Sequence, residues 1–248
     1  VPNQHGAWAM LASPLLVGVL AGGPAWVHLP LALFWFVGYF AFFATGLWLK
    51  SGRRARYLPP MRTYLALTTA LGVVVLLIEP RLVRWAPLFV VPLAIGLWSS
   101  ARRRERALLS GLATTVGSAL MTVVAYDAGA HAAALPDSAR AWMLAAVQAA
   151  YFAGTVFYVK SMIRERGDAA FLRLSVGYHL ACVAAAAIAT ALSLAGTGRP
   201  GWATVAVFGA LAVRAALVPR LSPPPSPARI GVGEIVATVA VALTSLAA

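Results

Sequence analysis

Nine long apolar stretches divide the sequence, and each is close to the length that crosses a lipid bilayer. They run over residues 6–22, 27–49, 62–79, 83–99, 107–126, 140–160, 171–195, 201–218 and 229–248. A spanning helix needs about 20 mostly apolar residues, because it rises about 1.5 Å per residue through a hydrocarbon core about 30 Å thick. The pattern predicts an all-α, polytopic transmembrane bundle of about nine helices that forms a single domain over residues 1–248.

Composition excludes a water-soluble protein of this length. Hydrophobic residues make up 61% of the chain and charged residues 11%, whereas soluble domains carry about 25% charged residues. Residues 1–10 contain no Lys or Arg, so the first stretch is interpreted as a retained helix and not as a cleaved signal peptide. The stretches 62–79 and 83–99 are close together, and Pro87 and Pro92 interrupt the second. One tight hairpin is therefore an alternative there.

The basic residues predict how the chain is oriented. A net charge of +13 would suggest nucleic acid in a soluble protein, but here the Lys and Arg residues lie between apolar stretches, so membrane lipids are the expected partners and nucleic acid is not. If the nine stretches cross the membrane in turn, only four of the twenty basic residues fall on the side opposite the N-terminus: Arg81, Arg84, Arg140 and Arg199. The positive-inside rule then predicts a bacterial inner-membrane protein with its N-terminus in the cytoplasm and its C-terminus outside.

Two ionisable residues lie inside predicted spans and are candidates for chemistry. His179 lies about eight residues into the seventh span and Glu234 about five residues into the ninth. Intramembrane ionisable groups are costly and often functional, so we interpret both as possible acid/base groups in a cavity that opens to the cytoplasm. The alternative for His179 is a hydrogen bond to a neighbouring helix, and the alternative for Glu234 is an ion pair with a nearby arginine.

A second group of candidates lies at the predicted cytoplasmic surface, where basic side chains and a helix N-terminus can bind an anionic head group. The candidates for head-group binding are Asn3, Gln4, Lys50, Arg53, Arg54, Lys160 and Arg164, and those for catalysis are His5 and Asp168 in addition to His179 and Glu234. The alternatives are a capped helix start for the N-terminal segment, and topology signals or contacts with anionic lipid for the loops. Cys182 is the single cysteine, which excludes a disulfide framework and a cysteine-based metal site.

The opening segment Pro2-Asn3-Gln4-His5-Gly6-Ala7-Trp8-Ala9-Met10 strongly resembles the signature of the YwiC-like family of bacterial membrane proteins. The resemblance extends over the chain, including the basic loop after the second span and the Arg164-Glu165-Arg166-Gly167-Asp168 region. It implies a multi-pass bacterial membrane protein and brings no activity with it.

The layout is also similar, more distantly, to the UbiA superfamily of intramembrane prenyltransferases. Those proteins have nine helices, a cytoplasmic N-terminus and active-site loops after helices two and six, and the segment 97–103 looks like their basic segment before helix five. They hold magnesium and a lipid pyrophosphate with Asp-rich motifs. Here the loop after the second span has no carboxylate, and the loop after the sixth has only Glu165 and Asp168. No metal ligands are therefore predicted, and Lys and Arg would replace part of the metal charge.

Three functions remain open at this point, and the cofactor is left unidentified. The first is a UbiA-like enzyme that acts on a phosphorylated isoprenoid or other lipid, with that lipid phosphate as its substrate. The second is a transporter of lipids or small anions, which would explain a polar cavity without a catalytic motif. The third is a non-catalytic membrane assembly partner.

Overall fold

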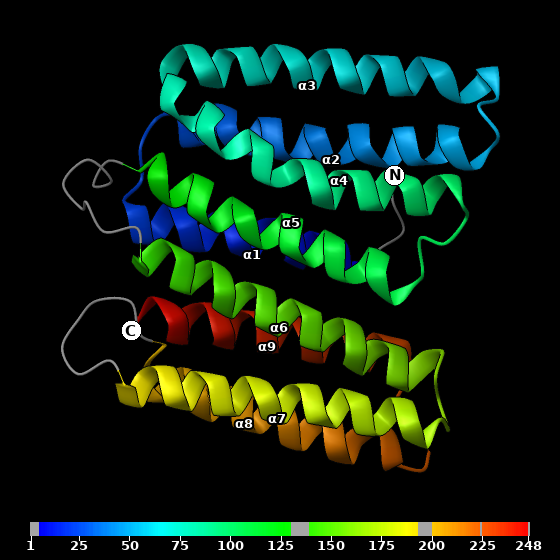
Figure 1. Cartoon of the computed structure of the whole chain (residues 1–248), viewed down its shortest axis with the longest axis vertical. Coiled ribbons are helices and arrows are strands. Elements are labelled where there is room, and N and C mark those ends of the chain that lie inside the picture. Colours follow the sequence, from blue (N-terminus) through cyan, green and yellow to red (C-terminus); the bar gives the residue numbers. More distant parts are fainter. Residues whose placement is uncertain (1–4, 130–138, 193–199, 224, 248) are drawn as a thin grey trace. The chain divides into compact units, whose positions relative to one another are not determined.

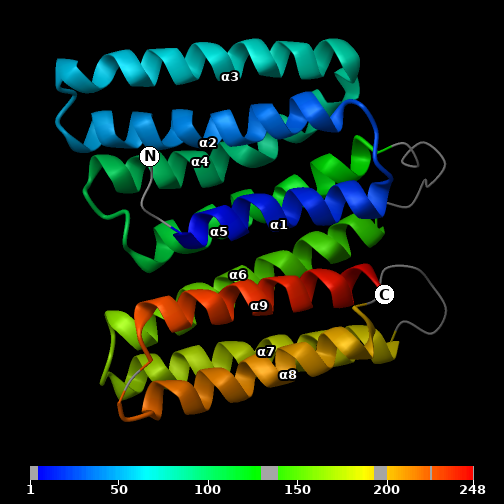
Figure 2. The same cartoon turned by 180° about the vertical axis from the view of Figure 1, so that it is seen from behind.

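The computed structural model describes residues 5–129, 139–192, 200–223 and 225–247, and helices account for nearly all of them. Within these ranges the chain forms nine α-helices, three short 3-10 helices and no β-strand (Figures 1 and 2). The elements are α1 (His5–Gly22), α2 (His28–Lys50), η1 (Ala55–Tyr57), α3 (Leu58–Ile78), η2 (Pro80–Trp85), α4 (Ala86–Ala101), α5 (Leu108–Asp127), α6 (Ala139–Ile163), α7 (Ala169–Leu192), α8 (Gly201–Leu217), η3 (Val218–Arg220) and α9 (Pro227–Leu246). The predicted all-α class is confirmed.

The helices match the apolar stretches of the sequence. Eight helical segments in the described ranges are long and apolar enough to cross a membrane, and α1 contributes a shorter apolar one. The stretches 62–79 and 83–99 form two separate helices, α3 and α4, which η2 joins directly. Pro87 lies in the first turn of α4, where the missing N–H would have no partner within the helix. The chain is therefore built as a multi-pass membrane protein.

The described residues fall into two compact units, one formed by residues 14–129 and the other by residues 5–13, 139–192, 200–223 and 225–247. The first unit contains α2 to α5 and the second half of α1, and its core includes Leu31, Val75, Leu82 and Met121. The second unit contains α6 to α9 and the first half of α1, and its core includes Phe152. The prediction of a single domain over the whole chain stays a prediction.

Close helix packing in the first unit depends on two glycines of α1. A Cβ atom at Gly18 would collide with the carbonyl oxygen of Thr122 on α5, and one at Gly22 would collide with that of Tyr126. The two glycines are four residues apart, a spacing that lets membrane helices approach backbone to backbone. His28 also links α2 to α5, because its Nε2 donates to the Ala125 carbonyl (2.8 Å) while its Nδ1 accepts from the Ala25 N–H (2.9 Å).

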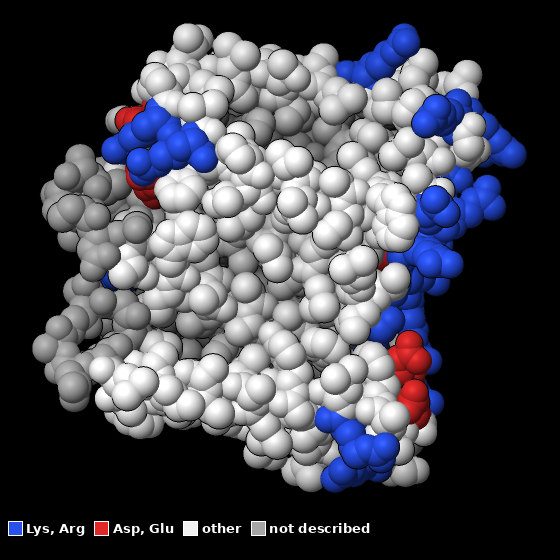
Figure 3. Space-filling model, viewed as in Figure 1, with Lys and Arg blue, Asp and Glu red and all other residues white. Residues whose placement is uncertain are grey.

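Charged side chains gather at helix ends in both units, and a band of uncharged side chains covers the helices between those ends (Figure 3). In the first unit, Lys50 ends α2 and the 102–106 loop follows α4, whereas Arg81 and Arg84 lie at the opposite helix ends in η2. In the second unit, Lys160 is in the last turn of α6 and Arg214 in the last turn of α8. Successive helices of each unit run in opposite directions, as the predicted alternation of basic loops requires.

Candidate functional site

A buried ion pair between α8 and α9 is the centre of the second unit's polar groups. Arg214 Nη1 lies 2.8 Å from Glu234 Oε1, and only 18% of the arginine side chain and 12% of the glutamate side chain are exposed. Arg214 lies in the last turn of α8, and Glu234 lies about two turns, or about 10 Å, into α9. The pair therefore sits inside the spans, toward the end of the unit where the basic residues gather.

The other oxygen of the Glu234 carboxylate is held by hydroxyl groups of α6. Thr155 Oγ1 donates to Glu234 Oε2 at 2.8 Å, and the Tyr151 hydroxyl lies 3.2 Å from the same oxygen. The Tyr151 hydroxyl is also 2.9 Å from Thr238 Oγ1, one turn further along α9. Tyr151 and Thr155 are four residues apart and so lie on one face of α6. This face positions the carboxylate for its contact with Arg214.

The Arg214 guanidinium is only partly satisfied by its contacts. It lies over the Tyr158 ring, 4.2 Å from the ring centroid, a geometry that favours a cation. Its contact with Glu234 is an ion contact and not a directed hydrogen bond, and its Nε and Nη2 atoms have no hydrogen-bond partner among the described residues. A buried guanidinium with unused N–H groups is costly unless an acceptor is supplied. Arg214 can thus bind an additional anionic or neutral oxygen.

His179 on α7 places a ring nitrogen that can accept a hydrogen bond beside the cavity that Arg214 also lines. Its Nδ1 is 2.7 Å from the Ser175 carbonyl oxygen, and a carbonyl can only accept, so Nδ1 carries the proton and Nε2 of the neutral ring is an acceptor. Nε2 points at Gly154 on α6, where an added Cβ would lie 3.0 Å from it. The glycine thus makes room for the imidazole between the two helices.

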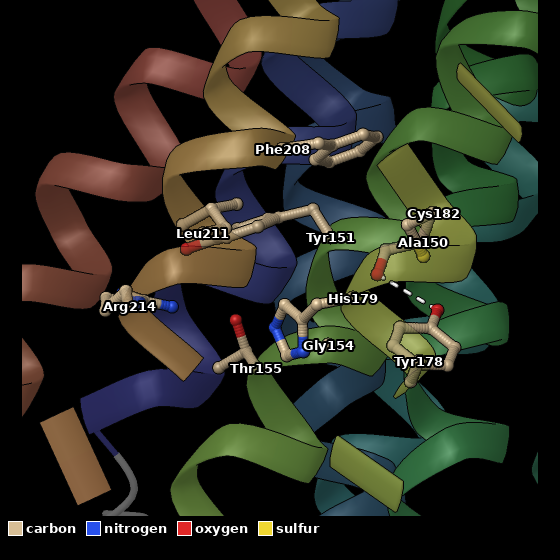
Figure 4. Close-up of a pocket in the computed structure, with 10 residues that line it drawn as sticks. All are labelled: Ala150, Tyr151, Gly154, Thr155, Tyr178, His179, Cys182, Phe208, Leu211 and Arg214. Carbon is tan, nitrogen blue, oxygen red and sulfur yellow. Dashed lines mark hydrogen bonds between the residues drawn. The ribbon is translucent and has the colours of Figure 1, made fainter. Parts of the chain in front are cut away.

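A small cavity lies between these groups (Figure 4). Its volume is about 10 Å³, and its walls come from α6, α7 and α8. The lining residues are Ala150, Tyr151, Gly154, Thr155, Tyr178, His179, Cys182, Phe208, Leu211 and Arg214. A volume of roughly 10–15 Å³ is what one water molecule needs. In this conformation the cavity has room for a water-sized group between Arg214 and His179, and a larger ligand requires the helices to separate.

The structure thus brings two of the four predicted catalytic residues into one cluster. His179 lines the cavity, and Glu234 is hydrogen-bonded to Tyr151 and Thr155, which also line it. Asp168 lies elsewhere, at the start of α7, where its Oδ1 accepts from the backbone N–H groups of Ala170 (2.8 Å) and Phe171 (3.1 Å). That is a helix-capping arrangement. His5 is the first residue of α1, and its side chain lies outside the described residues, as do Asn3 and Gln4.

Both predicted head-group lysines form ion pairs within their own unit. Lys50 Nζ lies 2.6 Å from Glu105 Oε1 in the first unit, and Lys160 Nζ lies 3.6 Å from Glu165 Oε1 in the second. Burial raises the pKa of the Glu105 carboxyl, but the hydrogen bond and charge of Lys50 outweigh it, so this pKa lies below its usual value. An anionic head group would therefore have to compete with a carboxylate for each of these lysines.

The three predicted head-group arginines lie at helix ends. Arg53 follows α2 with a left-handed backbone (φ 65°), and its N–H donates to the Trp48 carbonyl at 2.9 Å. The Arg54 N–H donates to Ser51 Oγ at 3.2 Å in the same loop. Arg164 follows the end of α6, in the second unit. Their assignment to head-group binding stays a prediction.

Sequence reasoning missed three contributors to the cluster, namely Arg214, Tyr151 and Thr155. Arg214 was assigned to the basic side as a topology signal, although it precedes the end of its apolar stretch. The signal that could have identified it is a cation inside a span, because such a group needs a partner there. Among the described residues, no group of three or more His, Cys, Asp or Glu residues is placed to hold a metal ion.

Comparisons with known proteins identify relatives of this chain. A family model described as "YwiC-like protein" matches residues 1–126. A Bacillus subtilis (strain 168) protein named "Uncharacterized protein YwiC" is 36% identical over 185 residues, which is 73% of this chain and 74% of that protein. A Haemophilus influenzae protein named "Uncharacterized protein" is 27% identical over 182 residues, 73% of this chain and 75% of its own length. No solved structure matches the chain.

Proposed function

Since the chain belongs to the YwiC-like protein family, we propose that it is a bacterial cell-membrane protein that binds the phosphorylated head of an isoprenoid or other lipid beside Arg214. The N-terminus and the basic loops would face the cytoplasm and the C-terminus the outside, because the positive-inside rule governs short loops. The lipid would reach the second unit through the membrane with its head at the basic end.

The observation that carries this proposal is the incomplete bonding of Arg214. Within the ranges that the structure describes, its Nε and Nη2 atoms have no hydrogen-bond partner, and the side chain lines the cavity together with His179. A guanidinium binds phosphate oxygens through paired N–H groups. Glu234 is the anion that Arg214 holds in this conformation, so a phosphate would either share the guanidinium with this carboxylate or replace it.

The same geometry suggests roles for the two ionisable neighbours. Glu234 can accept a proton when an incoming anion takes over Arg214, and Thr155 and Tyr151 keep the released carboxyl in place through hydrogen bonds to Oε2. The His179 Nε2 acceptor lies on the other side of the cavity. In an enzyme these two groups would act as base and acid, and Asp168 and His5 would act nearer the surface.

In the second unit, the head group would also meet Lys160 and Arg164, which close the end of α6. Binding of an anionic head group by Lys50, Arg53 and Arg54, in the loop after α2 of the first unit, and by Asn3 and Gln4 is proposed separately. Arginine and lysine would supply the positive charge that Asp-bound magnesium supplies in UbiA-type prenyltransferases, so the relation to that superfamily is part of the proposal.

Binding of farnesyl pyrophosphate to the purified protein, measured by native mass spectrometry with and without magnesium, tests the proposal. We expect Arg214→Gln to weaken binding roughly tenfold or more, because it removes a charge-assisted contact. We expect Glu234→Gln to strengthen binding, because it removes the competing carboxylate. Opposite effects of the two variants distinguish a binding arginine from a purely structural ion pair.

The control for this experiment is Arg84→Gln in the first unit, which breaks an ion pair of the same kind, 2.6 Å between Arg84 Nη2 and Asp127 Oδ1. It should leave farnesyl pyrophosphate binding unchanged. No binding by the wild-type protein, or equal binding by the wild type and Arg214→Gln, would refute the proposal. Because Arg214→Gln leaves Glu234 buried and unpaired, the double variant with Glu234→Gln provides a second test in which neither charge remains.

Transport of a small anion is a second function that one observation favours. Arg214 already holds an internal anion, Glu234, and exchange of an internal for an external anion is a simple way to couple uptake to protonation of the carboxylate. Phosphate uptake into proteoliposomes that depends on a pH gradient and disappears in Glu234→Gln would support this function. Uptake equal to that of empty vesicles would exclude it for phosphate.

A further inference from the structure

An open groove runs along the outer face of α7 in the second unit, away from the Arg214 cavity. Its volume is about 530 Å³, within the roughly 300–1,000 Å³ of small-molecule sites. Its walls are formed by Ala169, Leu172, Arg173, Val176, Gly177, Leu180 and Arg220. Leu172, Val176 and Leu180 are four residues apart and so share one face of α7, whereas Ser175 and His179 are buried on the inner side. The groove floor is therefore apolar and separate from the polar cluster.

The groove has the length of one lipid leaflet. From Ala169 to Leu180 it covers eleven residue steps of α7, or about 16 Å at 1.5 Å per residue. Half of a hydrocarbon core about 30 Å thick is close to the same length. Because Ala169 is the first residue of α7, the groove begins at the basic end of the unit and ends near the middle of the span.

Two arginines stand at the end of the groove where a lipid head would lie. Arg173 is in the second turn of α7 and Arg220 is the last residue of η3, and both are exposed. Within the described part of the chain, neither has a carboxylate within salt-bridge distance. Gly177 widens the groove between them and Leu180, because a Cβ atom added there would meet nothing within 4 Å.

We infer that this groove is a binding site for one anionic glycerophospholipid of the leaflet at the basic end. One acyl chain lies along Leu172, Val176 and Leu180, and the phosphate accepts hydrogen bonds from Arg173 and Arg220. Arginine suits a phosphate because its planar guanidinium can donate two parallel hydrogen bonds. None of these residues belongs to the Arg214 cluster, so this inference does not depend on the function proposed above.

Lipid retention by the purified full chain, measured by native mass spectrometry, tests this site. The probes are phosphatidylglycerol and phosphatidylcholine with identical acyl chains, added at equal concentrations. We expect the wild type to retain phosphatidylglycerol preferentially, and Arg173→Gln with Arg220→Gln to reduce that preference on the order of 30-fold, since each arginine near anionic lipid contributes roughly a fivefold factor. Gly177→Leu should reduce retention of both lipids, because the new side chain fills the acyl-chain path.

Matched controls exist in the same unit. Arg166 and Arg229 are also exposed at the basic end, so their double change to Gln removes the same charge away from the groove. Gly231→Leu places a side chain where an added Cβ likewise meets nothing within 4 Å. Retention unchanged by the Arg173/Arg220 pair, equal loss in the control pair, or displacement of phosphatidylglycerol by an equal concentration of farnesyl phosphate would overturn the inference.

Discussion

Each unit contains an arginine–carboxylate pair that joins residues far apart in the sequence, and the two pairs differ in burial and in hydrogen bonding. In the first unit, Asp127 at the end of α5 accepts from Arg84 Nη2 at 2.6 Å through one oxygen and from Trp85 Nε1 at 2.8 Å through the other. The arginine side chain is 56% exposed. In the second unit both partners of the Arg214–Glu234 pair are largely buried, and two guanidinium nitrogens have no partner.

The difference follows from the position of each arginine along its span, which determines whether its unused N–H groups can reach water. Arg84 lies at a helix end, where its unused N–H groups can reach water or lipid head groups, so its role is to tie η2 to α5. Arg214 lies inside the spans, where an unused N–H group has no such outlet. Incomplete bonding is costly there, and this cost is the physical reason for assigning a ligand to Arg214 and none to Arg84.

The largest effect expected from this comparison is the loss of stability in Arg214→Gln. Removing one partner of a buried ion pair leaves the other charge uncompensated, which costs about 3–5 kcal/mol. Thermal unfolding in detergent, followed by tryptophan fluorescence, measures the change. The matched Arg84→Gln variant should lose much less, because Arg84 is exposed. Equal losses in the two variants would remove the distinction between the pairs.

The double variant Arg214→Gln with Glu234→Gln sharpens the same test. Replacing both charges leaves no unpaired ion, and the glutamine at 234 can still accept from Thr155 and Tyr151. We expect it to recover most of the stability lost in the single variant. If the double variant is as unstable as Arg214→Gln alone, the arginine stabilises the unit by packing over Tyr158 and not by its charge.

Asp127→Asn is expected to have an intermediate effect. The asparagine can still accept one hydrogen bond but loses its charge and offers a donor where Trp85 Nε1 or Arg84 also donates. Leaving such a partner without an acceptor costs about 1–3 kcal/mol. The measurement is the same thermal unfolding assay, with Asp168→Asn, at an exposed helix cap, as the control. A wild-type melting temperature for Asp127→Asn would mean that the pair contributes nothing to the first unit.

Much of the fold could be predicted because lipid imposes simple rules on sequence. Apolar length fixes where helices run, so the stretch 201–218 corresponds to α8 (Gly201–Leu217) and 107–126 to α5 (Leu108–Asp127). Boundaries shifted where local chemistry extends a helix: α3 begins at Leu58, ahead of the predicted 62, because Pro59 and Pro60 fit a first turn. The close approach of α1 to α5 was not predicted, although the four-residue spacing of Gly18 and Gly22 is a signal of close helix packing.

The site could be predicted only in part, because its side chains come from different helices and the sequence does not show which helices pack together. His179 and Glu234 were identifiable as ionisable groups inside spans, and Glu234 forms the ion pair that was the structural alternative to an acid/base role, with Arg214 as its partner. Which arginine it is depends on the packing of α8 against α9. The hydroxyls of Tyr151 and Thr155 gave no signal of their own, because such groups are common in membrane helices as packing contacts.

The exposed Lys50–Glu105 pair completes the comparison and should have the smallest effect. The side chains are 47% and 31% exposed, and such pairs contribute about 0.2–1 kcal/mol. The pKa of Glu105 lies below its usual value of 4.5, so the pair stabilises the folded chain at neutral pH, and this stabilisation is lost as the pH falls through the lowered pKa. The test is the difference in unfolding free energy between the wild type and Glu105→Gln, measured from pH 7 to pH 3. The two proteins share all other carboxylates, so the contributions of those groups cancel in the difference. We expect a small positive difference at pH 7 that vanishes at the acid end and shrinks in high salt; a difference that grows as the pH falls would show that Glu105 is not held ionised by Lys50.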